Sequence, residues 1–251
     1  MSKFIEKLQQ VFQPSAQSMG FQAVKAELRR PRIQLAVYIT GTKAKGLTKE
    51  IEGPDAVVLP VSASGNGKSL TGAWLAKGDA DEAEKAMNND ADFVIMPVTG
   101  DVLPPDKKIG KILQIESSIT DVLLRTVNEL SVDAVLLAED KENESSFTWK
   151  RMMLIQRFSS MLNKPLLIEV APGINEKEMQ MVWDAGISGV LLKTDAEQAE
   201  TSVLELRAII EKLSFPSKRK REKSLAFLPR AEAIKEEPEE DGDDGDGDGD
   251  E

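Results

Sequence analysis

Short apolar runs alternate with helical stretches along the chain from Ile33 to Leu213. Each run has the length of a strand and is apolar at almost every position, which is typical of parallel strands buried on both faces. Seven runs fit this description: Ile33–Thr40, Ala56–Val61, Phe93–Val98, Lys111–Glu116, Ala134–Glu139, Pro165–Val170 and Gly189–Lys193. Between them, apolar residues recur with a period near 3.6, as on one face of a helix.

This alternation predicts a parallel sheet with right-handed crossovers. We expect an α/β fold, an irregular (β/α)8 TIM-type barrel, and an open doubly wound parallel sheet is the alternative. The eighth strand would be Phe21–Ala26 or Ser224–Leu228. Two connections, Gly41–Gly53 and Thr99–Gly110, are short for a regular helix, so we expect the irregularity there.

The two ends of the chain differ from this pattern. Residues 2–13 form an amphipathic helix whose polar face carries both charges, which favours packing against the body over a membrane surface. Beyond residue 216 the chain is first basic (218–223) and then acidic (236–251), a composition that predicts disorder. We therefore expect one barrel domain, residues 1–216, and a disordered charged tail, residues 217–251.

Charge and composition exclude several classes of protein. The net charge of −11 lies in residues 231–251, which hold twelve acidic residues and one basic residue, so residues 1–230 are balanced. A balanced body argues against nucleic-acid binding, which needs a basic surface. The chain has no Cys and no His, which excludes thiolate nucleophiles, disulfides and histidine-based catalysis or metal binding. No apolar run approaches the roughly 20 residues of a membrane helix, and no signal peptide is visible, so we expect a cytoplasmic protein without a membrane partner.

Four consecutive predicted strands, lined up by their apolar runs, end with a charged residue at the same position. These residues are Glu116, Glu139, Glu169 and Lys193, whereas two earlier strands carry Pro60 and Pro97 there. The carboxyl ends of parallel strands are where ligands bind in such folds. Converging carboxylates suit Mg²⁺ or Mn²⁺, so Glu116, Glu139 and Glu169 are the candidate metal ligands.

Lys193 and Glu169 are the candidate catalytic residues of this group. A lysine beside carboxylates can transfer protons, hold an anion or form an imine. The alternative is structural: Glu169 or Glu139 pairs with Lys193 to hold the barrel together, or the side chains alternate between the inside and the outside of the sheet.

A glycine-rich segment, Ser62–Ser69, follows the second strand. It ends in Gly67-Lys68-Ser69 and precedes residues 70–76, which we interpret as helical, but the first glycine of a phosphate-binding P-loop is replaced by Ser62. Gly65, Gly67, Lys68 and Ser69 remain candidates for binding an anionic ligand at the mouth of the barrel.

Residues 164–193 resemble the last β-α-β portion of aldolase-type TIM barrels and are most similar to the ribulose-phosphate-binding group. The resemblance covers roughly residues 130–213. It implies a substrate phosphate bound by the loops after the last two strands, and Gly173 lies in the segment that matches the first of these loops. The second loop departs from the group, because Lys193-Thr194-Asp195 places a carboxylate that would repel phosphate.

Two functions follow from these observations. The first is a barrel enzyme of lyase, aldolase or isomerase type that acts on a small anionic metabolite with or without a divalent metal. The second is a non-catalytic barrel that assembles with itself or with a protein partner through its N-terminal helix and acidic tail.

Overall fold

The computed structural model describes residues 2–12, 32–40, 52–63, 70–102, 109–138 and 147–214. Contacts divide the chain into Met1–Arg219 and Lys220–Glu251, and all of the described residues belong to the first unit. None of the helices in these ranges is long and apolar enough to cross a membrane.

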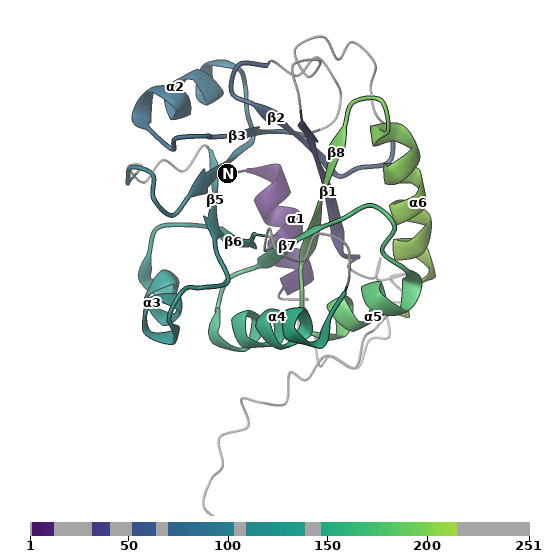
Figure 1. Ribbon diagram of the computed structural model, residues 1–251. Helices are drawn as coiled ribbons and strands as arrows, with labels where there is room; N and C mark the ends of the chain where they lie inside the picture. The colour runs from purple at the N-terminus through teal and green to yellow at the C-terminus, as the bar shows by residue number, and fades with distance from the viewer. Residues whose placement is uncertain are drawn as a thin grey trace, which may run out of the picture. The chain divides into compact units, whose positions relative to one another are not determined.

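Eight parallel strands follow one another around a closed barrel, and β8 pairs with β1 to complete it (Figure 1). The strands are β1 (Gln34–Thr40), β2 (Ala56–Pro60), β3 (Leu70–Trp74), β4 (Phe93–Pro97), β5 (Gly110–Ile115), β6 (Ala134–Leu137), β7 (Leu166–Val170) and β8 (Gly189–Asp195). The predicted TIM-type barrel is confirmed, and closure of the sheet excludes the open doubly wound alternative.

Helices surround the ring of strands (Figure 1). They are α2 (Ala80–Asn88), α3 (Asp121–Thr126), α4 (Trp149–Met161), α5 (Glu176–Asp184) and α6 (Ala199–Lys212), and a 3-10 turn, η2 (Val127–Glu129), follows α3. Side chains cap the first turns of α2 to α5, and Asn175 and Glu178 form a capping box on α5. These caps satisfy backbone N–H groups at the helix ends that lie beside the carboxyl ends of the strands.

The eighth strand is β3, which corrects the helical interpretation of residues 70–76. β3 pairs with β2 on one side and with β4 on the other. Gly72 makes this possible, because a Cβ atom there would lie 2.3 Å from Cζ of Phe93 inside the barrel. The strands proposed at residues 21–26 and 224–228 lie outside the described residues.

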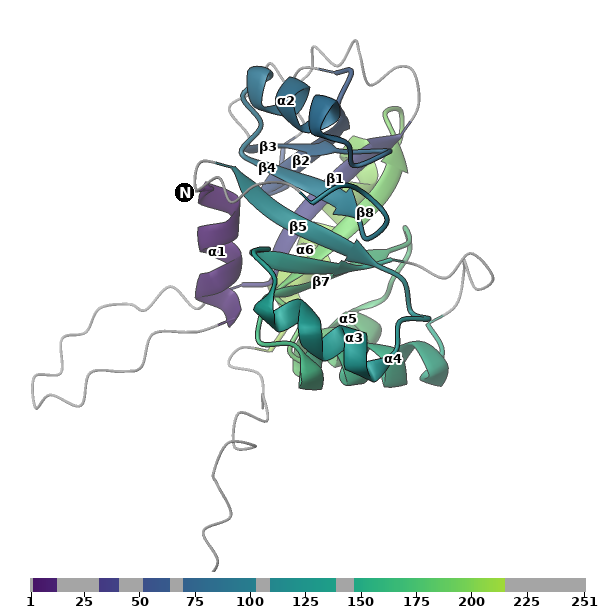
Figure 2. The same ribbon diagram turned by 90° about the vertical axis from the view of Figure 1, so that its left-hand side faces the viewer.

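The N-terminal helix, α1 (Lys3–Phe12), lies across the amino-terminal opening of the barrel (Figures 1 and 2). Its buried side chains include Phe4, Ile5 and Leu8, and the Phe4 ring stacks on Phe93 at 4.6 Å between centroids. Asp92, immediately before β4, accepts hydrogen bonds from Ser2 Oγ (2.6 Å) and from the backbone N–H of Phe4 (2.9 Å). The expectation that this helix packs against the body is therefore confirmed.

The side chains inside the barrel lie at successive levels along its axis, and the register of the strands decides which side chains share a level. Each strand of an eight-stranded barrel is shifted by about one residue relative to its neighbour, so side chains from alternate strands share a level. One level consists of residues from the even-numbered strands: Val58, Ile95, Leu136 and Leu191. The next level toward the carboxyl ends comes from the odd-numbered strands: Tyr38, Trp74, Gln114 and Glu169. The barrel interior therefore changes from aliphatic to polar and aromatic at this level.

Candidate active site

An ion pair lies inside the carboxyl end of the barrel. Lys193 Nζ on β8 is 2.8 Å from Glu169 Oε2 on β7. The Glu169 side chain is 1% exposed, whereas the Lys193 side chain is 40% exposed. Gln114 Nε2 on β5 donates to the other carboxylate oxygen of Glu169 at 3.3 Å. The carboxylate is thus held at the bottom of the site, and the lysine lies between it and solvent.

Two aromatic residues complete the same site. Lys193 Nζ lies 5.4 Å from the centroid of the Trp74 ring, a cation–π distance. The Tyr38 ring stacks on Trp74 with centroids 4.6 Å apart, and Tyr38 is the register partner of Lys193 on the neighbouring strand. Burial raises the pKa of the Tyr38 phenol, and the negative charge of Glu169 raises it further. The phenol is therefore held in its neutral, proton-bearing form.

The structure brings Glu169 and Lys193 together but separates Glu116 from them. The position in β5 that is level with Glu169 is Gln114, and Glu116 follows two residues later, beyond the end of the strand. Glu116 is exposed there, with Ser118 Oγ 3.5 Å from its carboxylate. Glu139 lies outside the described residues.

Sequence reasoning missed Tyr38, Trp74 and Gln114. Aligning the ends of the apolar runs assumes that every strand begins at the same height in the barrel. In the barrel each strand is shifted relative to its neighbour, so the side chains that share a level come from alternate strands. The signal that could have found them was a polar or aromatic side chain inside an otherwise apolar strand, which Tyr38 and Gln114 both are.

The described carboxylates do not fit a divalent metal well. Glu169 already accepts hydrogen bonds at both oxygens, and Glu116 is at the exposed rim. Within the described ranges, no three acidic side chains lie together in an arrangement that could hold a metal ion. Glu169 and Lys193 are thus the ion pair that the described part of the site offers for proton transfer.

The predicted phosphate-binding loops are described only in part. Gly65, Gly67, Lys68 and Ser69 lie outside the described residues, and the helix expected after them is strand β3. Gly173, with φ +91°, lies in the exposed turn after β7 and lines a small hollow against α6. The charged residue among the described side chains of that hollow is Glu205.

The end of β8 also departs from a phosphate-binding loop. β8 continues as a strand through Asp195, which is in register with Thr40 of β1. Thr40 Oγ1 donates to Asp195 Oδ1 at 2.7 Å. A carboxylate at this position opposes the binding of an anion beside it.

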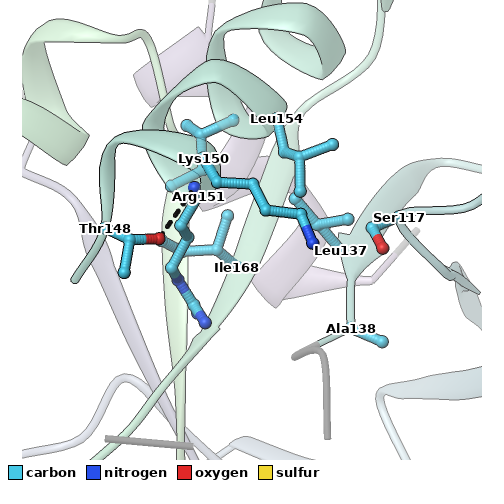
Figure 3. A pocket seen from close by; sticks show the side chains of 9 residues that line it. Ser117, Leu137, Ala138, Thr148, Lys150, Arg151, Leu154 and Ile168 are labelled. Atoms are coloured by element: carbon cyan, nitrogen blue, oxygen red, sulfur yellow. Dashed lines mark hydrogen bonds between the residues drawn. The ribbon is translucent and has the colours of Figure 1, made fainter. Parts of the chain in front are cut away.

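A second pocket lies outside the barrel wall, between the first turn of α4 and the ends of β6 and β7 (Figure 3). Thr148 Oγ1 accepts a hydrogen bond from the Arg151 backbone N–H at 3.3 Å. The Arg151 guanidinium donates to the backbone carbonyl of Glu169. Arg151 therefore supports, from behind, the strand that carries the buried carboxylate.

Comparison with known proteins identifies the fold class. No protein-family model and no curated protein matches the sequence. KGPDC from Streptococcus mutans is similar in fold, with a TM-score of 0.57 and 9% identity over 72% of this chain and 99% of that one.

Two further solved structures share the fold. For 3-keto-L-gulonate-6-phosphate decarboxylase from Vibrio cholerae the TM-score is 0.55, at 11% identity over 73% of this chain and 99% of that one. For a mutant tryptophan synthase alpha-subunit from Pyrococcus furiosus it is 0.51, at 11% identity over 72% and 97%. The predicted TIM-type barrel is thus shared with these solved structures, and the likeness is one of fold.

Proposed function

We propose that this protein is a cytoplasmic barrel enzyme of lyase, aldolase or isomerase type that forms an imine between Lys193 and the carbonyl group of a small anionic metabolite. The observation that carries the proposal is the ion pair between the half-exposed Lys193 and the buried Glu169 at the carboxyl end of the barrel. This end is where enzymes of the TIM-barrel fold hold their active sites. The solved structures of similar fold include a decarboxylase, which supports carbon–carbon lyase chemistry.

The arrangement of the pair matches what imine chemistry requires. A lysine attacks a carbonyl carbon only as the neutral amine, so the ammonium first has to lose a proton. Glu169 Oε2, at 2.8 Å, is within reach to accept it, and the transfer leaves two neutral groups where the buried carboxylate was charged. The amine then faces the mouth of the barrel, where a substrate enters.

The anionic character of the substrate follows from the charge of the intermediate. An imine formed on Lys193 is protonated and keeps one positive charge, which attracts a negatively charged substituent. It also withdraws electrons from the neighbouring carbon, which eases the loss of a proton, a carboxylate or an aldehyde from that carbon. Glu169 can return its proton to the hydroxyl that leaves as water.

The test is reductive trapping. Borohydride reduces an imine to a stable amine, so wild-type protein incubated with small keto acids, aldehydes and sugar phosphates should gain mass on a peptide containing Lys193. Lys193→Met should abolish the adduct, and Lys212→Met, which removes an exposed lysine on α6, should leave it unchanged. Absence of an adduct with every carbonyl compound would contradict the proposal.

Binding of Mg²⁺ or Mn²⁺ at Glu116, Glu139 and Glu169 is tested independently. A ligand that binds only the folded state raises the midpoint of thermal unfolding with concentration. A bound metal should give such an increase in wild type and a smaller one in Glu139→Gln and Glu169→Gln. Equal midpoints with and without either metal would remove these residues as ligands.

The non-catalytic alternative receives less support. The apolar stripe of α1 is buried in the barrel, so only its polar face is left for a partner. An assembly role would then rest on that polar face and on residues 217–251. A change in the number of chains per particle in solution on deletion of residues 218–251 would favour it, and an unchanged number would count against it.

A further inference from the structure

We infer that Tyr38 is a catalytic residue of this site and donates the proton that the carbonyl oxygen of the substrate takes up when Lys193 attacks. This inference rests on the proposed imine chemistry. It adds a third functional group, on a different strand, to the pair of Glu169 and Lys193.

Three observations place the Tyr38 ring in the neighbourhood of the reacting groups. Tyr38 and Lys193 are register partners on β1 and β8, so their side chains enter the barrel from adjacent strands. The Tyr38 ring stacks on Trp74, over whose ring Lys193 Nζ also lies. Glu169 is close enough for its charge to act on the phenol. Because the Tyr38 ring and the Lys193 amine both lie against Trp74, a carbonyl group bonded to Lys193 would come into the neighbourhood of Tyr38.

Other groups of this level are already engaged. Gln114 donates to Glu169, and Glu169 accepts the proton of the lysine. Tyr38 carries the hydroxyl among the described side chains of this level. A phenol with the ordinary pKa of 10.0 is protonated at neutral pH, and the raised pKa of Tyr38 acts in the same direction. Stacking on Trp74 fixes the ring plane, so little orientation has to be gained when the substrate binds.

The proton balance closes with these three residues. Lys193 gives one proton to Glu169, and its nitrogen then bonds to the carbonyl carbon while the π electrons move to oxygen. The oxygen takes the phenolic proton of Tyr38, and the phenolate recovers a proton from the newly bonded nitrogen. Glu169 finally protonates the hydroxyl, which leaves as water as the C=N bond forms. One ammonium and one carbonyl become one iminium and one water, and Tyr38 and Glu169 are regenerated.

Tyr38→Phe tests the role, because it keeps the stacked ring and removes only the hydroxyl. The measurement is the rate of adduct formation with a carbonyl compound that traps the wild type. Loss of a general acid slows a reaction by about 10²–10⁴-fold, so we expect at least a tenfold loss with an unchanged unfolding midpoint. Thr126→Val, which removes an exposed hydroxyl on α3, should react at the wild-type rate. A loss of less than about tenfold in Tyr38→Phe would overturn the assignment.

A second measurement does not depend on a substitution that perturbs folding. Tyr38 is the only tyrosine of the chain, so growth on fluorotyrosine alters this phenol alone and makes it more acidic. A stronger acid should accelerate imine formation, and an unchanged rate would contradict proton donation by Tyr38. The two proposals fail differently: no adduct in wild type overturns both, whereas normal trapping with an unaffected rate in the variants overturns the role of Tyr38 alone.

Discussion

At the scale of a single residue, the pKa of Tyr38 depends on its surroundings in the candidate active site. Burial and the charge of Glu169 both disfavour its phenolate, whereas the same phenol in the unfolded chain ionises near its ordinary pKa of 10.0. Above that pH the folded protein retains a proton that the unfolded chain has lost. The free energy of unfolding should therefore fall as the pH rises above about 10, and this contribution should be absent in Tyr38→Phe.

Absorbance of the phenolate measures this pKa directly because the chain has a single tyrosine. We expect wild type to titrate above 10.0, the ordinary value, and Glu169→Gln to titrate lower than wild type, since the opposing charge is gone. In the stability measurement, the pH dependence of the free energy of unfolding of Tyr38→Phe is subtracted from that of wild type. The difference excludes the contribution of the lysines, which ionise in the same pH range. Equal titration curves for wild type and Glu169→Gln would mean that the two side chains do not interact.

At the scale of elements, apolar runs predicted seven of the eight strands. Parallel strands buried on both faces carry this signal in their own residues. β3 lacks it, because Leu70-Thr-Gly-Ala-Trp74 contains a polar residue and a glycine. Gly72 is explained only by Phe93 of the neighbouring strand, a contact between segments about twenty residues apart that no local pattern contains.

Only part of the candidate active site could be predicted from the sequence. Glu169 and Lys193 were found because both follow an apolar triplet and both enter the barrel. Gln114 was missed in favour of Glu116 because the level of a side chain depends on the shift between strands, which is a property of the closed barrel. Tyr38 and Trp74 were missed because their role comes from stacking across β1 and β3.

At the scale of the barrel domain, the two ends of the barrel are filled by different side chains. The carboxyl end contains the polar and aromatic site, whereas α1 fills the amino end with Phe4, Ile5 and Leu8. Gly110 leaves room for this helix, because a Cβ atom there would lie 2.5 Å from Ile5 Cγ1. α1 therefore belongs to the interior core, although it precedes the first strand by more than twenty residues.

Phe4→Ala tests whether this closure stabilises the barrel as a whole. Phe4 is fully buried and stacks on Phe93, so truncation should lower the free energy of unfolding by about 3–5 kcal/mol, as for other buried phenylalanines. Gln10→Ala, an exposed change on the same helix, should alter it by less than about 0.5 kcal/mol. Urea unfolding followed by tryptophan fluorescence measures both variants. If α1 were only attached to the surface, the two substitutions would have equally small effects; a cooperative loss of stability for Phe4→Ala alone would show that the barrel and its N-terminal helix unfold as one unit.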